Sequence, residues 1–553
     1  MGQDAAARPR PQVPGAPAVS RAEAIGLSVL GAAMILLRAA YCFAFPFDSD
    51  EPQHLHIAWA WTQRLLPYRD VFDNHAPLFH VLSAPLVALI GENPRILVFM
   101  RLALIPISAA TLWGSYLLGR RIFGTRAGWW AAILCGLSPT FFFKSVEYRT
   151  DVLWAALWVL AMAVFLSGPP APRRWFCGGL LLGACLAVSL KSVMLLSALG
   201  IAGAGLMLLG ARAPRLPASV LAALSGMLVL PAALVAYFAA RGALAEMYYC
   251  AVGHNLLPGV GRWGYSKRLW LLAPILALLL AAARFLLRRL HGQGAAIAFL
   301  LLLGGSQYLL LSTVWPVHTR QDLLPFYPLF TVLLAGALLA WRSWGVRVAV
   351  VLACLQLVIL PVLSPVRGSG TRDQERLLAE VLRLTDPADP VMDLKGQSVF
   401  RNRPFYYALE TMTLERMARG LIADTIPERL IETRTCVAPS DTKGFPPRAR
   451  AFLEDRYVVV GAWRVSGSFL PPAADGADRP RPFEIAIPAR YAVTGAEGPA
   501  RGMLDGAPCD GPRDLVPGRH EYRPAEGEGP IAVIWAQAAE RGFTPFAGSG
   551  GPL

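Results

Sequence analysis

Charged side chains are scarce in this 553-residue sequence: only 16% of the residues are Asp, Glu, Lys or Arg, whereas 55% are hydrophobic. A soluble protein of this length carries more charge than that on its surface. Apolar runs of about 20 residues, long enough to span a bilayer, recur between Ala22 and Leu363, and a soluble composition returns after Arg367. The sequence therefore predicts an integral membrane protein with its membrane part first and a soluble part after it.

Several familiar signatures are missing as well. The eight cysteines show no metal-ligand spacing, and the soluble part contains no nucleophile elbow, phosphate loop or metal motif. The formal net charge of +15 comes from arginines spread along the chain rather than from one basic stripe, which argues against nucleic acid as a partner. Cys436 and Cys509, the two cysteines of the soluble part, could pair if that part lies outside the cytoplasm.

Arginines beside the apolar segments predict the topology. Arg8, Arg10 and Arg21 precede the first segment and put the start of the chain inside. The run 76–90 is too short for a clean span and contains two prolines, so we expect it to lie at the outer surface as a helix. Eleven spans are then expected, near 22–43, 95–118, 127–144, 151–167, 175–190, 192–209, 217–239, 269–287, 295–313, 323–341 and 346–364. This odd number leaves the soluble part outside.

Composition divides the chain into four expected parts. They are a disordered cytoplasmic tail (1–21), a membrane domain (22–365) with its first outer loop at 44–94, an α/β domain (366–470) and a small β-rich region (471–553). In the soluble part we expect helices at 371–384 and 404–416 and strands at 390–394, 456–461, 483–493, 518–522 and 531–535. No pattern in this part indicates chemistry. The predicted fold class is an all-α polytopic membrane protein with an extracytoplasmic α/β and β-rich end.

Ionisable residues are nearly absent from the expected spans. Away from the ends of the spans, only Arg38 and Arg101 lie inside them, both toward the outer end. An ion-coupled transporter usually needs ionisable groups near the bilayer midplane, so a water-filled pathway is not indicated. The ionisable residues gather instead at the outer face: Asp48, Asp50, Glu51, Asp73, His75, Glu147, Arg149, Asp151, Lys191, His254, His318, Arg320 and Asp322.

The stretch that follows the first span holds three acids in four positions, Asp48, Asp50 and Glu51. Carboxylates this close repel one another, so they must be solvated, bound to a metal or poised to take a proton. A solvated loop is the plainest interpretation. The three acids are also hard oxygen ligands that would suit a divalent cation, Mg or Mn, and the sequence does not decide between a metal and none.

Short motifs recur in a familiar order across residues 22–364. They are Asp50-Glu51 followed by Leu65-Leu-Pro-Tyr-Arg-Asp70; Asn74-His-Ala-Pro-Leu-Phe-His80; Arg101 followed by Gly119-Arg-Arg-Ile-Phe-Gly124; Glu147-Tyr-Arg-Thr-Asp151; and His318-Thr-Arg-Gln-Asp322. In this order and spacing they resemble the GT-C superfamily of polyprenyl-phosphate-sugar-dependent glycosyltransferases. Among its branches the chain is most similar to the one that contains protein mannosyltransferases and bacterial aminoarabinose transferases.

The resemblance implies a GT-C fold and an inverting transfer of a hexosyl or pentosyl group. The donor would be a polyprenyl-phosphate sugar and the acceptor a lipid, glycan or protein. The expected location is a bacterial inner membrane with the soluble part in the periplasm. The alternatives are a transporter or flippase of lipid-linked sugar and a noncatalytic envelope assembly protein.

The resemblance also implies residue roles. Asp50 matches the family's catalytic Asp and would be the general base, with Glu51 and Asp151 orienting acceptor and sugar. Contacts to the donor phosphate are expected from Arg101, Lys191, Arg320, His75 and His318. His75 stands where some members carry a Lys-bearing pattern. The plainer interpretations are a helix cap for Asp151, and topology, ion pairing or snorkelling for Arg101, Lys191 and Arg320.

Overall fold

The computed structural model describes residues 19–211, 216–260, 269–290, 293–315, 317–365, 370–471, 480–525 and 529–546. Nearly all of the expected cytoplasmic tail lies outside these residues. The chain forms two compact units. The first unit takes Met1–Phe45, Arg101–Arg241 and Gly259–Gly368, and the second takes Pro46–Met100, Gly242–Pro258 and Ser369–Leu553.

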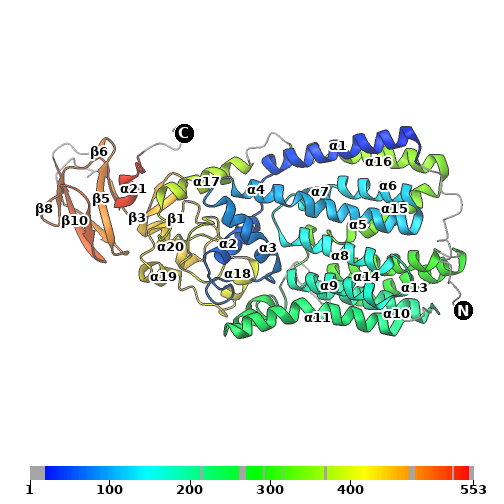
Figure 1. Cartoon of the computed structure of the whole chain (residues 1–553). Coiled ribbons are helices and arrows are strands. Elements are labelled where there is room, and N and C mark those ends of the chain that lie inside the picture. The colour runs from blue at the N-terminus through cyan, green and yellow to red at the C-terminus, as the bar shows by residue number, and fades with distance from the viewer. Residues whose placement is uncertain are drawn as a thin grey trace, which may run out of the picture. The chain divides into compact units, whose positions relative to one another are not determined.

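The first unit is built from helices, which Figure 1 shows running side by side. They are α1 (Arg21–Ala44), α5 (Ile105–Phe123), α6 (Thr125–Leu137), α7 (Pro139–Lys144), α8 (Thr150–Leu166), α9 (Pro172–Val188), α10 (Ser192–Leu208), α11 (Leu216–Ala240), α13 (Leu272–Arg289), α14 (Gly294–Thr313), α15 (Phe326–Leu339) and α16 (Arg342–Leu363), with the 3₁₀ turns η3 (Leu269–Leu271) and η4 (Arg320–Leu323). Helix α4 (Ile96–Ala103) contains the point where the chain passes between the units. Every segment expected to span is helical.

Two of these segments are interrupted. The segment at 95–118 is divided at Leu104 into α4 and α5, and the one at 127–144 is divided at Ser138 into α6 and α7. Pro106 and Pro139 each stand in the first turn of the second piece. Proline lacks the backbone N–H and clashes with the preceding turn, so a new helix begins there instead of the old one continuing.

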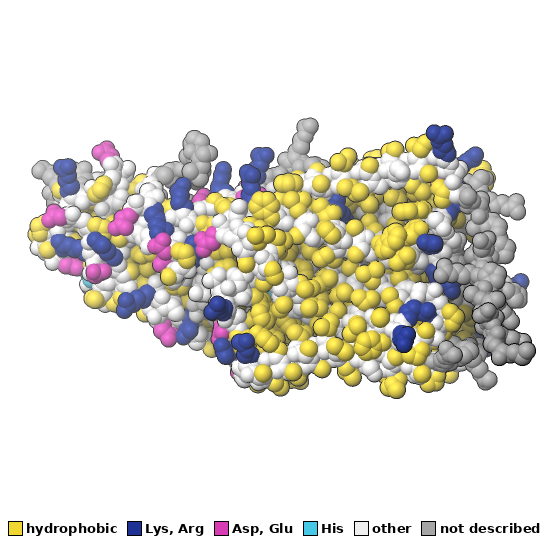
Figure 2. All heavy atoms as spheres, in the orientation of Figure 1, with side chains coloured by type: hydrophobic (Ala, Val, Ile, Leu, Met, Phe, Trp, Pro, Cys, Tyr) yellow, Lys and Arg dark blue, Asp and Glu magenta, His cyan; other side chains and the backbone are white. Residues whose placement is uncertain are grey.

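Length and apolar composition alone qualify five helices among the described residues to cross a membrane. They are Arg21–Ala44, Ile96–Phe123, Leu216–Ala240, Gly294–Thr313 and Trp344–Leu363. On the face shown in Figure 2, hydrophobic side chains cover the helices of this unit, and Leu36, Leu208 and Val362 are each more than 70% exposed. In water such a surface would be costly, whereas in lipid it is the favourable one. The protein is therefore a membrane protein.

Close packing in the first unit depends on small residues. Helix α9 lies along α11, and a Cβ added to Gly179 would come within 2.0 Å of the carbonyl oxygen of Ala223. Gly183, one turn later, faces the carbonyl oxygen of Met227 in the same way, at 2.4 Å. Only glycine permits backbones to approach this closely, as is common between helices in membranes.

The second unit combines short helices with antiparallel sheets. Its helices are α2 (Asp50–Thr62), α3 (Leu78–Ile90), α12 (Leu244–Tyr248), α17 (Gly370–Leu384), α18 (Thr411–Ala418), α19 (Ile426–Glu432), α20 (Pro447–Arg456) and α21 (Ala536–Glu540), with the π-helical turn η1 (Tyr249–Gly253). Its strands are β1 (Val437–Pro439), β2 (Tyr457–Val460), β3 (Trp463–Leu470), β4 (Arg481–Ile485), β5 (Ala489–Gly495), β6 (Gly498–Pro499), β7 (Gly502–Leu504), β8 (Ala507–Pro508), β9 (Arg513–Leu515), β10 (Gly518–Pro524) and β11 (Ile531–Trp535). The expected surface helix at 76–90 is formed as α3, and it belongs to this unit.

The strands form two sheets. The seven-stranded sheet has the order β1-β3-β11-β5-β6, with β2 also on β3 and β9 also on β5, and the four-stranded sheet has the order β4-β10-β7-β8. In the larger sheet Ile531 pairs with Leu470 and Val533 pairs with Ser468. This sheet contains strands from both sides of residue 471, where the α/β domain was expected to end and the β-rich region to begin. The division of the soluble part into these two regions stays a prediction. Among the described residues, Cys436 and Cys509 are not joined by a disulfide.

Two expected elements of the soluble part are wrong. Residues 390–394 form no strand, and only Val391 makes an isolated bridge, to Val437. The helix expected from residue 404 begins at Thr411, because the Glu410 side chain accepts hydrogen bonds from the N–H groups of Met412 and Thr413 and caps it there. The segment before this cap is irregular and carries side chains that matter below.

Candidate functional site

The acidic stretch forms the start of helix α2. Asp50 is its first residue, and the Asp50 side chain is 29% exposed. The Lys395 ammonium donates a hydrogen bond to Asp50 Oδ1 at 2.9 Å and another to Ser49 Oγ at 3.1 Å. The helix N-terminus and this ammonium both complement the negative charge of the carboxylate. At the start of α2 a partly exposed carboxylate therefore lies beside a lysine ammonium.

The other two acids stabilise the first turn of α2. Asp48 Oδ1 accepts the backbone N–H of Asp50 at 3.1 Å, and Glu51 Oε1 accepts the backbone N–H of Asp48 at 2.9 Å. Glu51 is fully buried. Such bonds satisfy donors that a helix start would otherwise leave without partners. Both side chains thus have a structural role next to Asp50.

Lys395 lies in a turn that Asp393 organises. Asp393 accepts the backbone N–H groups of Gly396 at 2.6 Å and Ser398 at 2.8 Å, and the Arg403 guanidinium at 3.0 Å. Gly396 has φ +91°, and a Cβ there would lie 2.7 Å from Cβ of His56 on α2. The turn therefore lies directly against α2, and glycine is required at the point of closest approach.

His56 fixes the same turn from the other side. Its Nδ1 lies 2.8 Å from the carbonyl oxygen of Val399, and burial lowers the pKa of His56 below its usual value. A neutral imidazole donates one hydrogen bond, which Val399 accepts. Val399 has φ +52°, a strained conformation for a β-branched residue that the surrounding contacts hold in place.

A buried chain of imidazoles surrounds Asp73. His75 Nδ1 and His80 Nδ1 lie 3.1 Å from Asp73 Oδ1 and Oδ2, and His80 Nε2 lies 3.0 Å from His54 Nδ1. Burial raises the pKa of the Asp73 carboxyl, but His80 and His75 outweigh burial and leave that pKa below its usual value. Of the three imidazoles only His75 reaches the surface, with 25% of its side chain exposed.

A second buried pair joins the loop near 254 to the soluble part. His254 Nε2 lies 2.9 Å from Glu410 Oε1. Burial raises the pKa of Glu410, but the hydrogen bonds from His254 and Met412 lower it below the usual value. The Phe72 ring meets His254 edge to face and Tyr407 at a tilt, with ring centroids 4.8 and 5.2 Å apart. This cluster connects the residue 72 loop to the irregular segment before α18.

In the first unit, Lys191 lies between two carboxylates. Its Nζ is 2.8 Å from Asp151 Oδ1 and 2.6 Å from Asp322 Oδ1, and only 18% of its side chain is exposed. Burial alone would lower the pKa of Lys191, but Asp151 and Asp322 outweigh it and raise the pKa above its usual value. Arg149 Nε lies 3.4 Å from the other oxygen of Asp151. Lys191 is therefore a firmly charged ammonium with two anionic partners.

The remaining predicted residues of the first unit differ in their surroundings. His318 Nδ1 is 3.8 Å from Asp322 Oδ2, so His318 adjoins the Lys191 cluster. Arg320 is exposed at the start of η4. Arg101 is buried, and its Nη1 donates a hydrogen bond to the carbonyl oxygen of Phe45 at 2.7 Å, where α1 ends. Arg101 thus supports the end of a helix, and its expected contact with the donor phosphate stays a prediction.

A metal does not fit the three acids as they are arranged. Within the ranges that the structure describes, no group of three or more His, Cys, Asp or Glu residues could hold a metal ion. Glu51 Oε1 accepts a backbone N–H and Asp50 Oδ1 accepts the Lys395 ammonium. These carboxylate oxygens therefore accept N–H groups of the protein itself, and we derive no step through a metal.

Sequence reasoning found Asp50, His75, Asp151 and Lys191 as isolated positions. The structure brings Asp151, Lys191 and Asp322 into one cluster, and His75 together with Asp73. It adds Lys395, from the soluble part, next to Asp50. The segment Asp393-Leu-Lys-Gly396 has the composition of a tight turn, so the sequence alone could have predicted a turn that presents Lys395.

No family model matches the sequence, and no curated protein matches it either. Solved structures do match. ArnT from Cupriavidus metallidurans in the apo state has a TM-score of 0.55 at 13% identity, covering 80% of this chain and 98% of that one. The same protein bound to undecaprenyl phosphate gives 0.53 at 12% identity, over 80% and 97%. An oligosaccharyltransferase from Archaeoglobus fulgidus is less similar, with a TM-score of 0.45 at 12% identity over 81% and 72%. The chain thus has the fold of ArnT, the GT-C fold that its motifs predict.

Proposed function

We propose that this chain is a membrane glycosyltransferase that moves a hexosyl or pentosyl group from a polyprenyl-phosphate donor to a lipid, glycan or protein acceptor. The ArnT fold supports this proposal, since ArnT has been crystallised with undecaprenyl phosphate. The observation that carries it is Asp50, a partly exposed carboxylate at a helix start with a lysine beside it. The proposed location is a bacterial inner membrane with the second unit in the periplasm.

Asp50 would act as the general base. The acceptor hydroxyl donates its hydrogen bond to the Asp50 carboxylate, and its oxygen attacks the anomeric carbon of the donor sugar. As that bond forms, the bond from the anomeric carbon to the phosphate oxygen breaks, and the electron pair leaves with the polyprenyl phosphate. The acceptor proton ends on Asp50. Attack from the side opposite the phosphate inverts the anomeric centre.

The departing phosphate requires positive charge. In the second unit His75 is the cation that we favour, because Asp73 orients it and a quarter of its side chain is exposed. With both ring nitrogens protonated, His75 can donate one N–H to Asp73 and the other to phosphate. The family resemblance further proposes the phosphate role for Lys191, Arg320, His318 and Arg101. It proposes the orienting role for Glu51 and Asp151.

The test measures transfer of a radiolabelled sugar from a panel of polyprenyl-phosphate donors in membranes. Asp50→Asn keeps the shape of the side chain and removes its basicity, so we expect transfer to fall by a factor of about 100 or more. Glu415→Gln is the matched control, since it removes a carboxylate that is 40% exposed and pairs with Arg419 on the same segment. Equal transfer by wild type and Asp50→Asn at equal protein level would remove Asp50 from catalysis. Absence of transfer with every donor would favour the transporter instead.

A further inference from the structure

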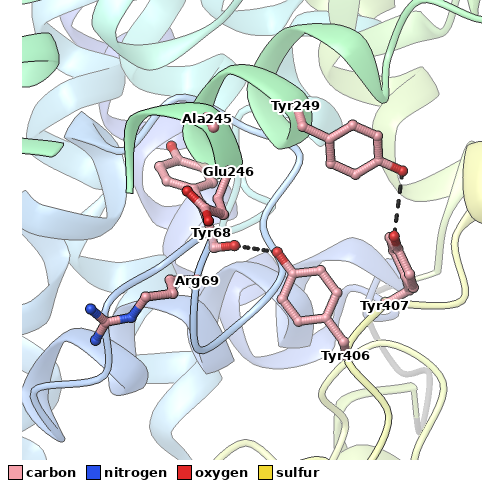
Figure 3. A pocket seen from close by; sticks show the side chains of 7 residues that line it. All are labelled: Tyr68, Arg69, Ala245, Glu246, Tyr249, Tyr406 and Tyr407. Atoms are coloured by element: carbon pink, nitrogen blue, oxygen red, sulfur yellow. Dashed lines mark hydrogen bonds between the residues drawn. The ribbon is translucent and has the colours of Figure 1, made fainter. Parts of the chain in front are cut away.

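A pocket of about 480 Å³ lies within the second unit. Figure 3 shows four tyrosines around it, Tyr68, Tyr249, Tyr406 and Tyr407, together with Arg69 and Glu246. The residues come from the turn after α2, from α12 and η1, and from the irregular segment before α18. The volume falls within the range of about 300–1,000 Å³ typical of sites for small molecules.

The tyrosine wall is held in place by its own hydrogen bonds. The Tyr406 hydroxyl donates to the carbonyl oxygen of Tyr68 and lies 3.2 Å from Cys250 Sγ. The hydroxyls of Tyr249 and Tyr407 lie 3.5 Å apart, and the rings of Tyr406 and Tyr407 meet edge to face at 5.0 Å. Burial raises the pKa of both Tyr406 and Tyr407. Both therefore remain phenols, and the wall offers aromatic rings with neutral hydroxyls.

Two further observations point to a ligand. Glu246 Oε2 is buried at the pocket and has no hydrogen-bond partner in the part of the chain that the structure describes. A buried carboxylate oxygen without a donor is costly, so a ligand donor would stabilise it. Tyr68 has φ +72°, a conformation that costs energy for a tyrosine. Strain of this kind persists where the surroundings enforce it, often at binding sites.

The chemistry of the wall selects the ligand. Aromatic faces bind the C–H faces of a ring, while hydroxyls and a carboxylate accept hydrogen bonds from ring hydroxyls. Arg69 and Glu246 line the pocket with opposite formal charges, and Arg69 is also paired with Asp70 at 2.9 Å. The lining therefore has no net positive charge that would select an anion. We propose that this tyrosine pocket binds an uncharged sugar ring. The inference rests on the proposed function and makes the pocket a subsite for the sugar of the acceptor or of the donor.

Direct binding tests the pocket without any transfer reaction. Full-length protein in lipid nanodiscs, which contain no sugar-based detergent, is mixed with methyl α-mannopyranoside or methyl β-arabinopyranoside, and saturation-transfer NMR reports contact. We expect binding to wild type and about tenfold weaker binding to Tyr407→Ala and Glu246→Ala. Tyr248→Ala is the matched control, because Tyr248 is 63% exposed and lies outside the lining. Glu246→Ala removes no packed ring, so it remains informative if Tyr407→Ala misfolds.

Three outcomes would overturn the inference. They are a wild type that binds neither glycoside, variants that bind as well as Tyr248→Ala does, and a preference for the cationic probe choline over both glycosides. The last result would identify an ammonium cage instead. Asp50→Asn should bind the glycosides like wild type, so failure of the pocket and failure of the proposed base give different results.

Donor titrations distinguish the two sources of the sugar. If the pocket receives the donor's sugar, Glu246→Ala raises KM for the labelled polyprenyl-phosphate sugar. If it receives a sugar of the acceptor, KM for the donor is unchanged and the rate at saturating donor falls. Either result supports the pocket as a sugar subsite, and an unchanged KM together with an unchanged rate contradicts it.

Discussion

The Lys191 cluster allows a structural role to be separated from a role in binding the donor phosphate. Replacing Lys191 with Met would leave Asp151 and Asp322 facing each other, and their side chains are only 2% and 0% exposed. Removing one partner from a buried ion pair costs about 3–5 kcal/mol, because the remaining charge stays buried without compensation. Because 18% of the Lys191 side chain is exposed, we expect the loss of stability to lie at the lower end of this range, about 3 kcal/mol.

A second substitution should reverse most of this loss. In Lys191→Met with Asp322→Asn, one carboxylate becomes a neutral amide, and Arg149 remains 3.4 Å from Asp151. We expect the double variant to recover more than half of the lost stability, which is the behaviour of coupled residues. Lys191→Arg keeps the charge and is the conservative control.

Thermal unfolding of the purified protein and sugar transfer are measured on the same four proteins. If Lys191 only neutralises its two carboxylates, the double variant regains both stability and transfer. If Lys191 also binds the donor phosphate, the double variant regains stability while transfer stays low and KM for the donor stays high. An unfolding midpoint unchanged by Lys191→Met would refute the reasoning, since no buried pair could then depend on that ammonium.

Two further predictions concern the second unit. Gly396→Ala should cost about 1–2 kcal/mol of stability, because its backbone is left-handed. It should also lower transfer, because the new Cβ would push against His56 and displace Lys395. Gly420→Ala is the control: Gly420 also has a left-handed backbone, at φ +71°, but nothing lies within 4 Å of its added Cβ, so this variant should lose stability and keep transfer. Asp73→Asn should lower the unfolding midpoint at pH 7. Because the pKa of Asp73 is depressed in the folded protein, its contribution is present above the unfolded pKa of about 3.9 and is lost as pH falls through the folded value. If the difference in unfolding midpoint between Asp73→Asn and wild type grew toward acid pH, the described contacts of Asp73 would be contradicted.

The fold was largely predictable because apolar length encodes membrane helices directly. The breaks at Leu104 and Ser138 were also present in the sequence, as Pro106 and Pro139, but a hydropathy pattern does not register them. The two errors in the soluble part share one kind of physical cause, a polar side chain that binds backbone N–H groups. Glu410 does so at the start of α18. Asp393 binds the N–H groups of Gly396 and Ser398, and this turn takes the place of the expected strand. A single polar side chain there outweighs the local propensity for regular structure.

The candidate site was predictable only in part. Acids that stand out in an apolar chain attract notice, so Asp50 could be found from charge alone. Its partner Lys395 lies 345 residues away along the chain, and neither periodicity nor local spacing carries information over that separation. The buried connections of Asp73 to His75 and His80 are short-range in sequence, yet they depend on the path of the loop between α2 and α3.

The use of lysine rather than arginine at a few positions nevertheless indicates where ion pairs form. Only five of the 52 cations are lysines, at positions 144, 191, 267, 395 and 443. Three of them, Lys144, Lys191 and Lys395, form ion pairs with carboxylates at 2.9 Å or less. Lysine presents a compact charge to a single oxygen, whereas arginine presents a broad planar fork. In a chain that otherwise uses arginine, a lysine is therefore the residue to examine first for a carboxylate partner, and that search leads from composition to Lys395 and Asp50.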